Sequence, residues 1–286
     1  MTKQHYTYTG DTPILLKDFL KSVGISKKLL TKLKREYMGI TRNSELIRSI
    51  DMVQPNDTIV LSIEDTSFLE PNSNLVVPIA YEDENVVVFD KSYNMPIHPS
   101  IKHQGDTLGN YFSYLYPNTT FRPIIRLDRN TSGLCIVAKN QRSAGMLQKQ
   151  INKVYYAIVT GTVDTSGTID APIKRETNSI IKRVVAPDGQ PSVTHYRRIS
   201  TNGKYSLVEV TLETGRTHQI RVHFSYIGHS LAGDDLYGGS LQDINRQALH
   251  AYSLSFNQPR TKENLEFKAE LSNDIKNLIE KLRKNN

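Results

Sequence analysis

Two consecutive segments near the start of the chain carry apolar residues at helical spacing. In the first, apolar residues lie three to four positions apart and a glycine follows, which predicts a helix that stops at Gly24: Leu15, Leu16, Phe19, Leu20 and Val23. The second begins after Ser26, a residue type that caps helices, and its apolar positions are Leu29, Leu30 and Leu33. Short runs at 38–41 and 55–63 predict strands, so residues 12–64 form a small unit of two helices and strands.

The rest of the chain is richer in strand patterns than in helical ones. A polar connector with Pro71 assigns residues 65–76 to a linker and residues 77–286 to a second domain. Apolar or alternating runs predict strands at 86–89, 134–138, 154–159 and 205–212, and 3.6-residue periodicity predicts helices at 108–116, 140–151 and 273–282. Because the strands do not alternate regularly with helices, we expect an α+β fold with a mixed or largely antiparallel sheet.

The charge distribution suggests a polyanionic partner. The 286 residues include 36 Lys and Arg against 29 Asp and Glu, a formal net charge of +7. This excess fits a solvated basic surface or a nucleic-acid partner. Five cations within nine residues on and after the second predicted helix favour a surface that contacts RNA phosphates: Lys27, Lys28, Lys32, Lys34 and Arg35.

Cysteine content and the lack of long apolar stretches bound the remaining possibilities. Cys135 is the single cysteine, so neither an intramolecular disulfide nor a thiolate zinc site is expected, and its apolar surroundings predict a core residue. The polar N-terminus has no apolar signal core and no 18-residue apolar stretch exists. We therefore expect a cytoplasmic protein with no membrane contact, and we expect it to be a monomer.

The stretch RLDRNTSGLCIVAKN places one carboxylate, Asp128, between Arg126 and Arg129. In one interpretation Asp128 accepts backbone hydrogen bonds in a turn and the arginines form surface ion pairs. In the other, nearby cations keep the carboxylate ionised so that it acts as a nucleophile or general base. The small residues 131–133 would then leave room for a ligand, and the apolar run after them would anchor the site.

Two further segments carry candidate site residues. LETGRTHQIRVHFSYIGH predicts a helix from Arg216 to Tyr226, on which Arg221 either faces water or points into a pocket and pairs with an acid. His218 and His223 are five positions apart and point in different directions, which makes a histidine zinc site a poor interpretation. In the strand KVYYA, one tyrosine belongs to the core and the other can stack on a flat ligand.

Together these segments resemble the RluA-type family of pseudouridine synthases. The resemblance covers residues 79–258 and rests on motifs in the family's order: IAYEDENVVVFDK with the PIHP turn, RLDRNTSG, KVYYAIVTG, TGRTHQIRVH with IGHSLAGDDLYG, and ALHAYSLSF. Residues 12–64 resemble the small RNA-binding domain named after ribosomal protein S-four, through the helix pair, the basic second helix and the terminal strand. Ile125 and Asn130 depart from the residues that are common in the family.

The resemblance implies an isomerase that converts uridine in RNA to pseudouridine. The bond between the base nitrogen and the sugar would break, the base would rotate, and it would rejoin through its carbon 5, with no cofactor and no metal. Asp128 falls on the essential aspartate, Tyr155 on the tyrosine that stacks on the base and Arg221 on the arginine that pairs with the aspartate. Arg126 is a candidate to hold the flipped nucleotide or fill its gap.

Two other functions remain open at this point. A catalytically inactive RNA-binding or ribosome-assembly factor would bind RNA without isomerising it, although the three pocket residues favour the enzyme. An enzyme of free nucleosides would not need the basic N-terminal unit. For the enzyme, a two-domain layout favours large-subunit ribosomal RNA as the substrate, with transfer RNA as the alternative.

Overall fold

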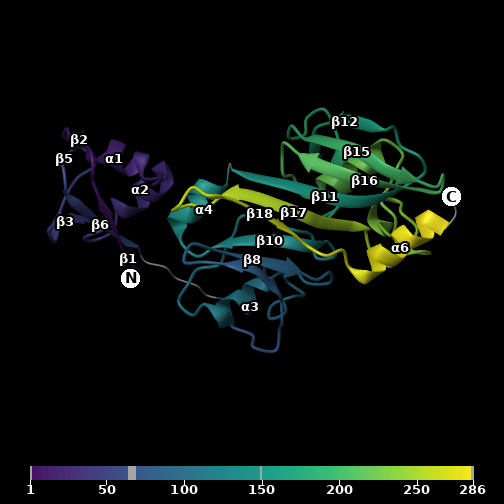
Figure 1. The fold of residues 1–286 in the computed structure, drawn as a ribbon, viewed down its shortest axis with the longest axis horizontal. Helices are drawn as coiled ribbons and strands as arrows, with labels where there is room; N and C mark the ends of the chain where they lie inside the picture. The colour runs from purple at the N-terminus through teal and green to yellow at the C-terminus, as the bar shows by residue number, and fades with distance from the viewer. Residues whose placement is uncertain (1, 64–68, 149, 285–286) are drawn as a thin grey trace.

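A computed structural model describes residues 2–63, 69–148 and 150–284 and shows a small N-terminal layer beside a long central sheet (Figure 1). The N-terminal part contains a sheet in the order β1-β6-β3-β4 and a strand pair β2-β5. These strands are β1 (Thr2–Thr7), β2 (Ile14–Leu15), β3 (Ile40–Arg42), β4 (Glu45–Leu46), β5 (Met52–Val53) and β6 (Thr58–Ile63). Helices α1 (Leu16–Ser22) and α2 (Lys27–Leu33) complete it.

The two N-terminal helices form largely as their apolar spacing predicts. Leu16, Phe19 and Leu20 are buried on α1, and Leu29 and Leu33 on α2, all in one core with the strands. The Ser26 side chain accepts a hydrogen bond from the Leu29 amide, which satisfies a free N–H of the first turn. Strand β1 was not predicted, because its pattern is polar and Tyr6 is the only buried residue among its described side chains.

The central sheet has the order β12-β15-β16-β11-β17-β10-β8-β7, with β18 paired to β17 and β9 to β10. Its strands are β7 (Ile79–Glu82), β8 (Val86–Lys91), β9 (Arg122–Pro123), β10 (Ser132–Ala138), β11 (Ile151–Thr160), β12 (Ser166–Asp170), β15 (Val193–Thr201), β16 (Tyr205–Leu212), β17 (Leu249–Asn257) and β18 (Asn264–Lys268). The β10–β17 pair is parallel and the other pairs are antiparallel. The predicted α+β class with a mixed sheet is thus confirmed.

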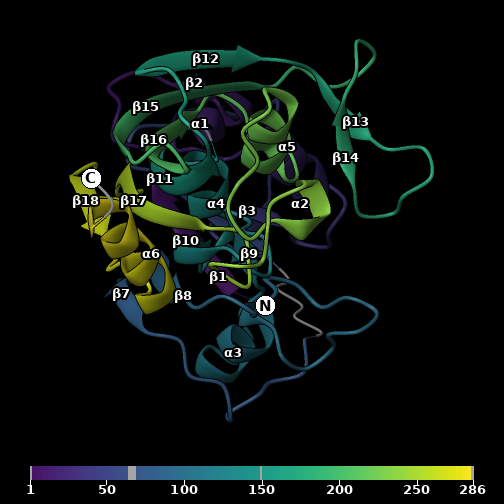
Figure 2. The ribbon, with the colours of Figure 1, turned by 90° about the vertical axis from the view of Figure 1, so that its right-hand side faces the viewer.

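Four helices, a one-turn helix and a hairpin surround the central sheet. They are α3 (Leu108–Leu115), α4 (Gln141–Leu147), α5 (Gln219–Tyr226), α6 (Asn273–Lys284), the 3-10 helix η1 (Asp235–Tyr237), and the hairpin of β13 (Ile173–Arg175) and β14 (Arg183–Val185). Figure 2 shows the β13–β14 hairpin projecting from the body, with α6 lying along the other side. Across the described residues, none of the helices combines the length and apolarity that a membrane crossing requires.

Two predicted helix boundaries are wrong. The helix predicted for 140–151 ends at Leu147, and Ile151 instead opens β11 opposite Phe256. The helix predicted from Arg216 starts at Gln219. There the Gln219 side chain accepts hydrogen bonds from the Arg216 amide and the Thr214 hydroxyl, which stabilises a turn in place of the first helical residues.

The segment between the two parts is partly described. Residues 65–68 of the predicted linker lie outside the described residues. From Leu69 onward the chain contacts the larger part: Leu69 and Leu75 pack against its core, and the Asn110 side chain donates to the Glu70 carbonyl. On the other side, the Arg142 side chain of α4 donates to the Val23 carbonyl at 2.8 Å, so the two parts also touch directly.

Candidate active site

Asp128 lies in the loop that leads into β10. Ile125 and Leu127 are buried, and the alternate residues Arg126 and Asp128 line a groove. The Asp128 backbone carbonyl accepts the Thr131 amide at 3.0 Å, while the carboxylate points toward Arg221. The interpretation of Asp128 as a carboxylate engaged only in its own turn is therefore wrong, because its side chain bonds to a residue far along the chain.

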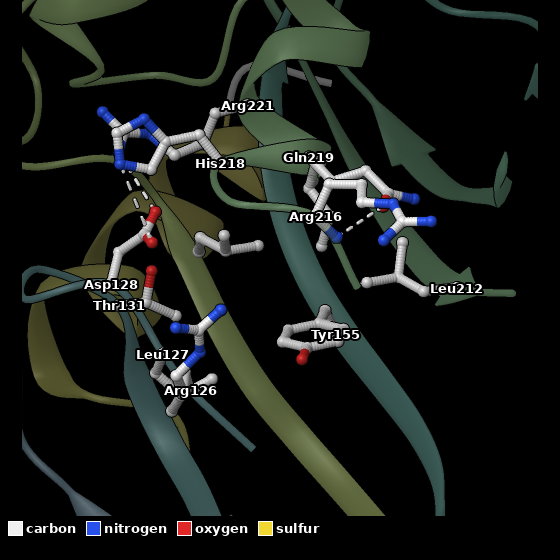
Figure 3. Close-up of a pocket in the computed structure, with 12 residues that line it drawn as sticks. Arg126, Leu127, Asp128, Thr131, Tyr155, Leu212, Arg216, His218, Gln219 and Arg221 are labelled. Carbon is white, nitrogen blue, oxygen red and sulfur yellow. Dashed lines mark hydrogen bonds and ion pairs between the residues drawn. The ribbon is translucent and has the colours of Figure 1, made fainter. Parts of the chain in front are cut away.

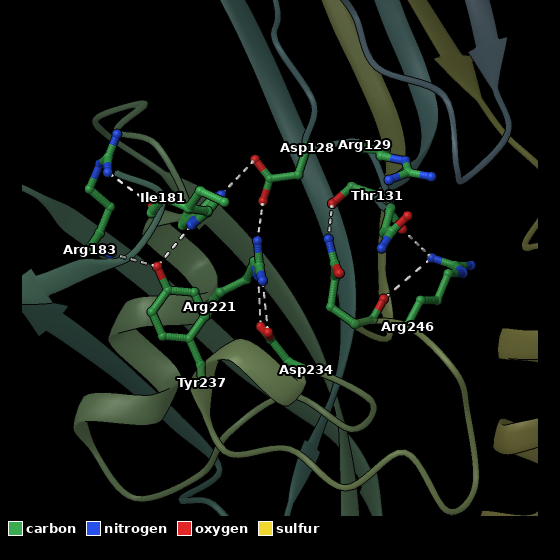
Figure 4. Close-up of polar contacts among 12 residues, drawn as sticks. Asp128, Arg129, Thr131, Ile181, Arg183, Arg221, Asp234, Tyr237 and Arg246 are labelled. Atoms are coloured by element: carbon green, nitrogen blue, oxygen red, sulfur yellow. Dashed lines mark hydrogen bonds and ion pairs between the residues drawn. The ribbon is translucent and has the colours of Figure 1, made fainter. Parts of the chain in front are cut away.

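Arg221 bridges two carboxylates (Figure 4). Its Nη1 atom donates to Oδ2 of Asp128 at 3.0 Å, and Nε and Nη2 donate to Oδ2 and Oδ1 of Asp234 at 2.7 and 2.8 Å. Arg221 and Asp234 are buried, whereas the Asp128 side chain is 24% exposed. Burial alone would lower the pKa of Arg221, but Asp234 and Asp128 raise it above its ordinary value. A fixed cation therefore holds one oxygen of Asp128 and leaves the other toward the groove.

Tyr155, on β11, presents its ring to a cavity beside Asp128 (Figure 3). The β11–β17 register shifts between Val154 and Tyr155, Tyr155 pairs with Ala251, and the Tyr155 side chain is almost completely buried. Burial raises the pKa of the Tyr155 hydroxyl, so the side chain stays protonated and neutral. Its neighbour Tyr156 stacks on Tyr252 with ring centroids 4.2 Å apart, so the two tyrosines have different tasks.

The cavity of about 60 Å³ beside Asp128 adjoins a groove of about 750 Å³. Both are lined by Arg126, Asp128, Tyr155, Arg216 and His218. Arg126 and Arg216 are exposed, so cationic side chains stand at the entrance while the carboxylate and the tyrosine lie deeper. This groove is of the size that holds a nucleotide-sized ligand.

The turn after Asp128 is packed, which corrects the expectation of open space there. Thr131 and Ser132 are buried. Gly133 has φ +105°, and a Cβ atom on it would lie 2.2 Å from the Ala251 carbonyl oxygen. A glycine is therefore needed for the close approach of β10 to β17, since a side chain would collide with the backbone.

Arg246 ties this turn to the C-terminal helix. It donates to the Asn130 carbonyl at 2.9 Å and to the Ser132 hydroxyl at 3.2 Å, and it forms an ion pair with Asp274 of α6. Lys91 supports the turn from β8, because its buried Nζ atom donates to the Ser92 and Arg129 carbonyls. These contacts fix the backbone that follows Asp128.

Three residues of this site were not singled out from the sequence. Asp234 stands in the motif quoted above, but no pattern pairs it with Arg221. Arg246 lies two residues before the motif ALHAYSLSF, and Lys91 ends an apolar strand, where a lysine usually reaches solvent. For Lys91 the signal available in the sequence is its place two residues after a run of four apolar residues.

The five basic residues that were predicted to contact RNA phosphates are exposed. Lys27, Lys28 and Lys32 lie on α2, while Lys34 caps its C-terminal end and Arg35 follows it, so the cations do not form one helical face. A second cavity of about 430 Å³ between α2 and α4 is lined by Lys28, Lys32 and Arg122. It shares Ile124 and Gln148 with the groove beside Asp128, so the two hollows adjoin.

A family model, two similar sequences and a similar solved structure all carry the name of pseudouridine or pseudouridylate synthases. The family described as RNA pseudouridylate synthase matches residues 85–226. The RNA pseudouridine synthase YjbO of Bacillus subtilis is 40% identical over 92% of this chain and 98% of its own length. The ribosomal large subunit pseudouridine synthase D of Pseudomonas aeruginosa is 35% identical over 85% of this chain and 84% of its own length. The structure of human RNA pseudouridylate synthase domain containing 1 superposes with a TM-score of 0.58 at 27% identity, covering 75% of this chain and 97% of the human chain.

Proposed function

The chain belongs to the RNA pseudouridylate synthase family and isomerises uridine in RNA to pseudouridine, and we propose that Asp128 is its catalytic carboxylate. The observation that carries the assignment is the Asp128–Arg221–Asp234 arrangement. Arg221 donates to both carboxylates and so holds the Asp128 side chain in one orientation at the groove. An ionised carboxylate at the groove is the group that nucleophilic attack or proton abstraction requires.

The neighbouring side chains fit a uridine that has left its helix. A base inside a duplex cannot reach a carboxylate at the bottom of a groove, so it must be flipped out or already unpaired. Tyr155 offers a neutral ring on which the base can stack. Arg126, exposed at the entrance, holds the nucleotide phosphate or fills the gap left in the RNA.

The N-terminal part supplies an RNA-contacting surface in this proposal. Residues 12–64 act as the S-four-like RNA-binding domain, 65–76 as the linker and 77–286 as the catalytic domain. The adjoining cavities lead from Lys28 and Lys32 to the groove beside Asp128. Phosphate contacts along that path would position the RNA without reading its sequence.

We propose large-subunit ribosomal RNA as the substrate. The support is the likeness to the ribosomal large subunit pseudouridine synthase D of Pseudomonas aeruginosa, which extends over most of both chains. Mapping pseudouridines in total RNA from cells with and without the gene tests this choice. Loss of a pseudouridine from large-subunit ribosomal RNA supports it, whereas loss only from transfer RNA transfers the activity to that substrate. Unchanged pseudouridines everywhere would favour an RNA-binding factor without catalytic activity.

A further inference from the structure

His218 adopts a backbone conformation that its residue type rarely adopts. Its φ and ψ are 59° and 17°, in the left-handed region, directly before the first residue of α5. Glycine or asparagine takes this conformation at lower cost. The His218 ring is 10% exposed, and its Nε2 atom lies 3.8 Å from Oδ1 of Asp128 (Figure 3). A strained residue whose ring faces a reactive carboxylate suggests that the imidazole itself has a task.

A chain of hydrogen bonds favours one position for the His218 ring proton. The Arg183 backbone amide, which can only donate, lies 2.9 Å from the Tyr237 hydroxyl oxygen (Figure 4). The same hydroxyl lies 2.8 Å from Nδ1 of His218. Because the oxygen already accepts the amide proton, its own proton is free to be donated to Nδ1. His218 then carries its hydrogen on Nε2, the atom that faces Asp128.

The surroundings keep this imidazole neutral. Burial lowers the pKa of His218, and Arg221 and Arg183 lower it further against the opposing attraction of Asp128 and Asp234. A cationic ring would also place an N–H on Nδ1 against a hydroxyl that already accepts the Arg183 amide. At neutral pH, His218 therefore offers Asp128 a single directed N–H donor without a second positive charge.

We propose that His218 is a positioning residue that orients the Asp128 carboxylate through an Nε2–H group held in place by Tyr237. Arg221 binds Oδ2 of the carboxylate, and His218 faces Oδ1. At 3.8 Å the His218 contact is longer than a hydrogen bond, as catalytic contacts often are before a substrate binds. This role rests on the proposed function of Asp128.

Nitrogen NMR of the full chain tests the tautomer without any assay of activity. The protein is labelled with ¹⁵N in its histidine rings, and the signals of His218 are assigned by their loss in His218→Asn. We expect a protonated Nε2 and an unprotonated Nδ1 at pH 7, and a mixture of tautomers in Tyr237→Phe, which keeps the ring but loses the donor. A proton on Nδ1 in the wild type, or no change in Tyr237→Phe, overturns the proposal.

Two substitutions separate the side chain from the backbone. Asparagine tolerates the left-handed conformation, but its amide is too short to reach Asp128; glutamine is less suited to the backbone, but its amide can reach the position of Nε2. In single-turnover assays at saturating RNA we expect His218→Asn to be about tenfold to a hundredfold slower than the wild type and His218→Gln to recover part of the rate.

If His218→Asn reacts as fast as the wild type, or faster than His218→Gln, the histidine has only a backbone role. Should His218→Gln fail to fold by circular dichroism, the NMR result alone decides. An active Asp128→Asn enzyme would instead overturn the proposed function, while the measured tautomer would stand.

Discussion

The guanidinium of Arg221 donates to the Asp128 carboxylate at 3.0 Å although the two residues are 93 positions apart in the chain. Helix α5 delivers the arginine, and the loop before β10 delivers the acid. The other edge of the guanidinium is occupied by Asp234, so Arg221 can hardly turn away from Asp128. The geometry makes the direction of the Asp128 carboxylate a property of the fold.

Asp234→Asn should destabilise the protein and slow the reaction. Asp234 is buried and accepts hydrogen bonds from Arg221 through both carboxylate oxygens. Asparagine removes the negative charge, so the buried Arg221 cation keeps Asp128 as its charged partner. We expect the free energy of unfolding to fall by about 3 kcal/mol, the scale measured when one partner of a buried ion pair is removed. Urea unfolding measures this, with Asp235→Asn as the matched control because Asp235 is the exposed neighbour. Equal losses in both variants would show that the pair with Arg221 is unimportant for stability.

Tyr155→Phe and Tyr155→Ala should differ in RNA affinity. Stacking needs the ring, and a base on an aromatic ring contributes about 1–3 kcal/mol. We therefore expect Tyr155→Phe to bind the substrate RNA nearly as tightly as the wild type, and Tyr155→Ala to bind about tenfold or more weakly. Equilibrium binding at one fixed salt concentration measures both. If the phenylalanine variant binds as weakly as the alanine variant, stacking is not the role of Tyr155.

Lys91 should make stability rise with pH. Burial lowers its pKa from 10.5 to about 7 in the folded protein. Between these values the unfolded chain holds a proton that the folded chain has released, so raising the pH favours the folded state, by at most about 1.4 kcal/mol per pH unit. Urea unfolding of the wild type and Lys91→Met from pH 6 to 9.5 should give curves that diverge above pH 7, with the wild type gaining. The exposed Lys102→Met variant serves as the control, and parallel curves for wild type and Lys91→Met would contradict the assignment.

The basic residues on α2 should contribute to the salt dependence of RNA binding. Neutralising Lys27, Lys28 and Lys32 together should weaken binding and lower the slope of log affinity against log salt by about two units if all three contact phosphates. The control neutralises Lys268 on β18 and Lys276 and Lys281 on α6, lysines that each form an ion pair with an acidic side chain. The rate at saturating RNA should survive in both variants. An unchanged slope in the α2 variant would move the RNA contact elsewhere, with the β13–β14 hairpin residues Lys174, Arg175, Lys182 and Arg183 as the next candidates.

The sequence was sufficient where local pattern decides structure. The apolar run at 134–138 forms the last five residues of a fully buried strand, and Ser26 caps α2 as its residue type predicts. The sequence was insufficient where tertiary contacts decide which residues become partners. Asp234 is recognised as a partner of Arg221 only when η1 and α5 are brought together.

Local signals also failed where a side chain competes with regular structure. Gln219 and the left-handed His218 shorten α5 at its start, although the residues from Arg216 onward continue a helical pattern. Strand β1 was missed for the opposite reason: it is held by pairing with β6, and only one of its described side chains is buried. Edge strands of this kind carry little hydrophobic pattern.

The central claim is that the ionised carboxylate of Asp128 performs the isomerisation, and Asp128→Asn tests it most directly. Asparagine has nearly the same shape but cannot act as a nucleophile or base. Pseudouridine is quantified by mass spectrometry after a single turnover on saturating substrate RNA, with Asp164→Asn, an exposed carboxylate outside the groove, as the control. We predict no detectable product from Asp128→Asn, with RNA affinity and circular dichroism close to wild type and full activity in the control. Product formation by Asp128→Asn at a rate near that of the wild type would contradict the account.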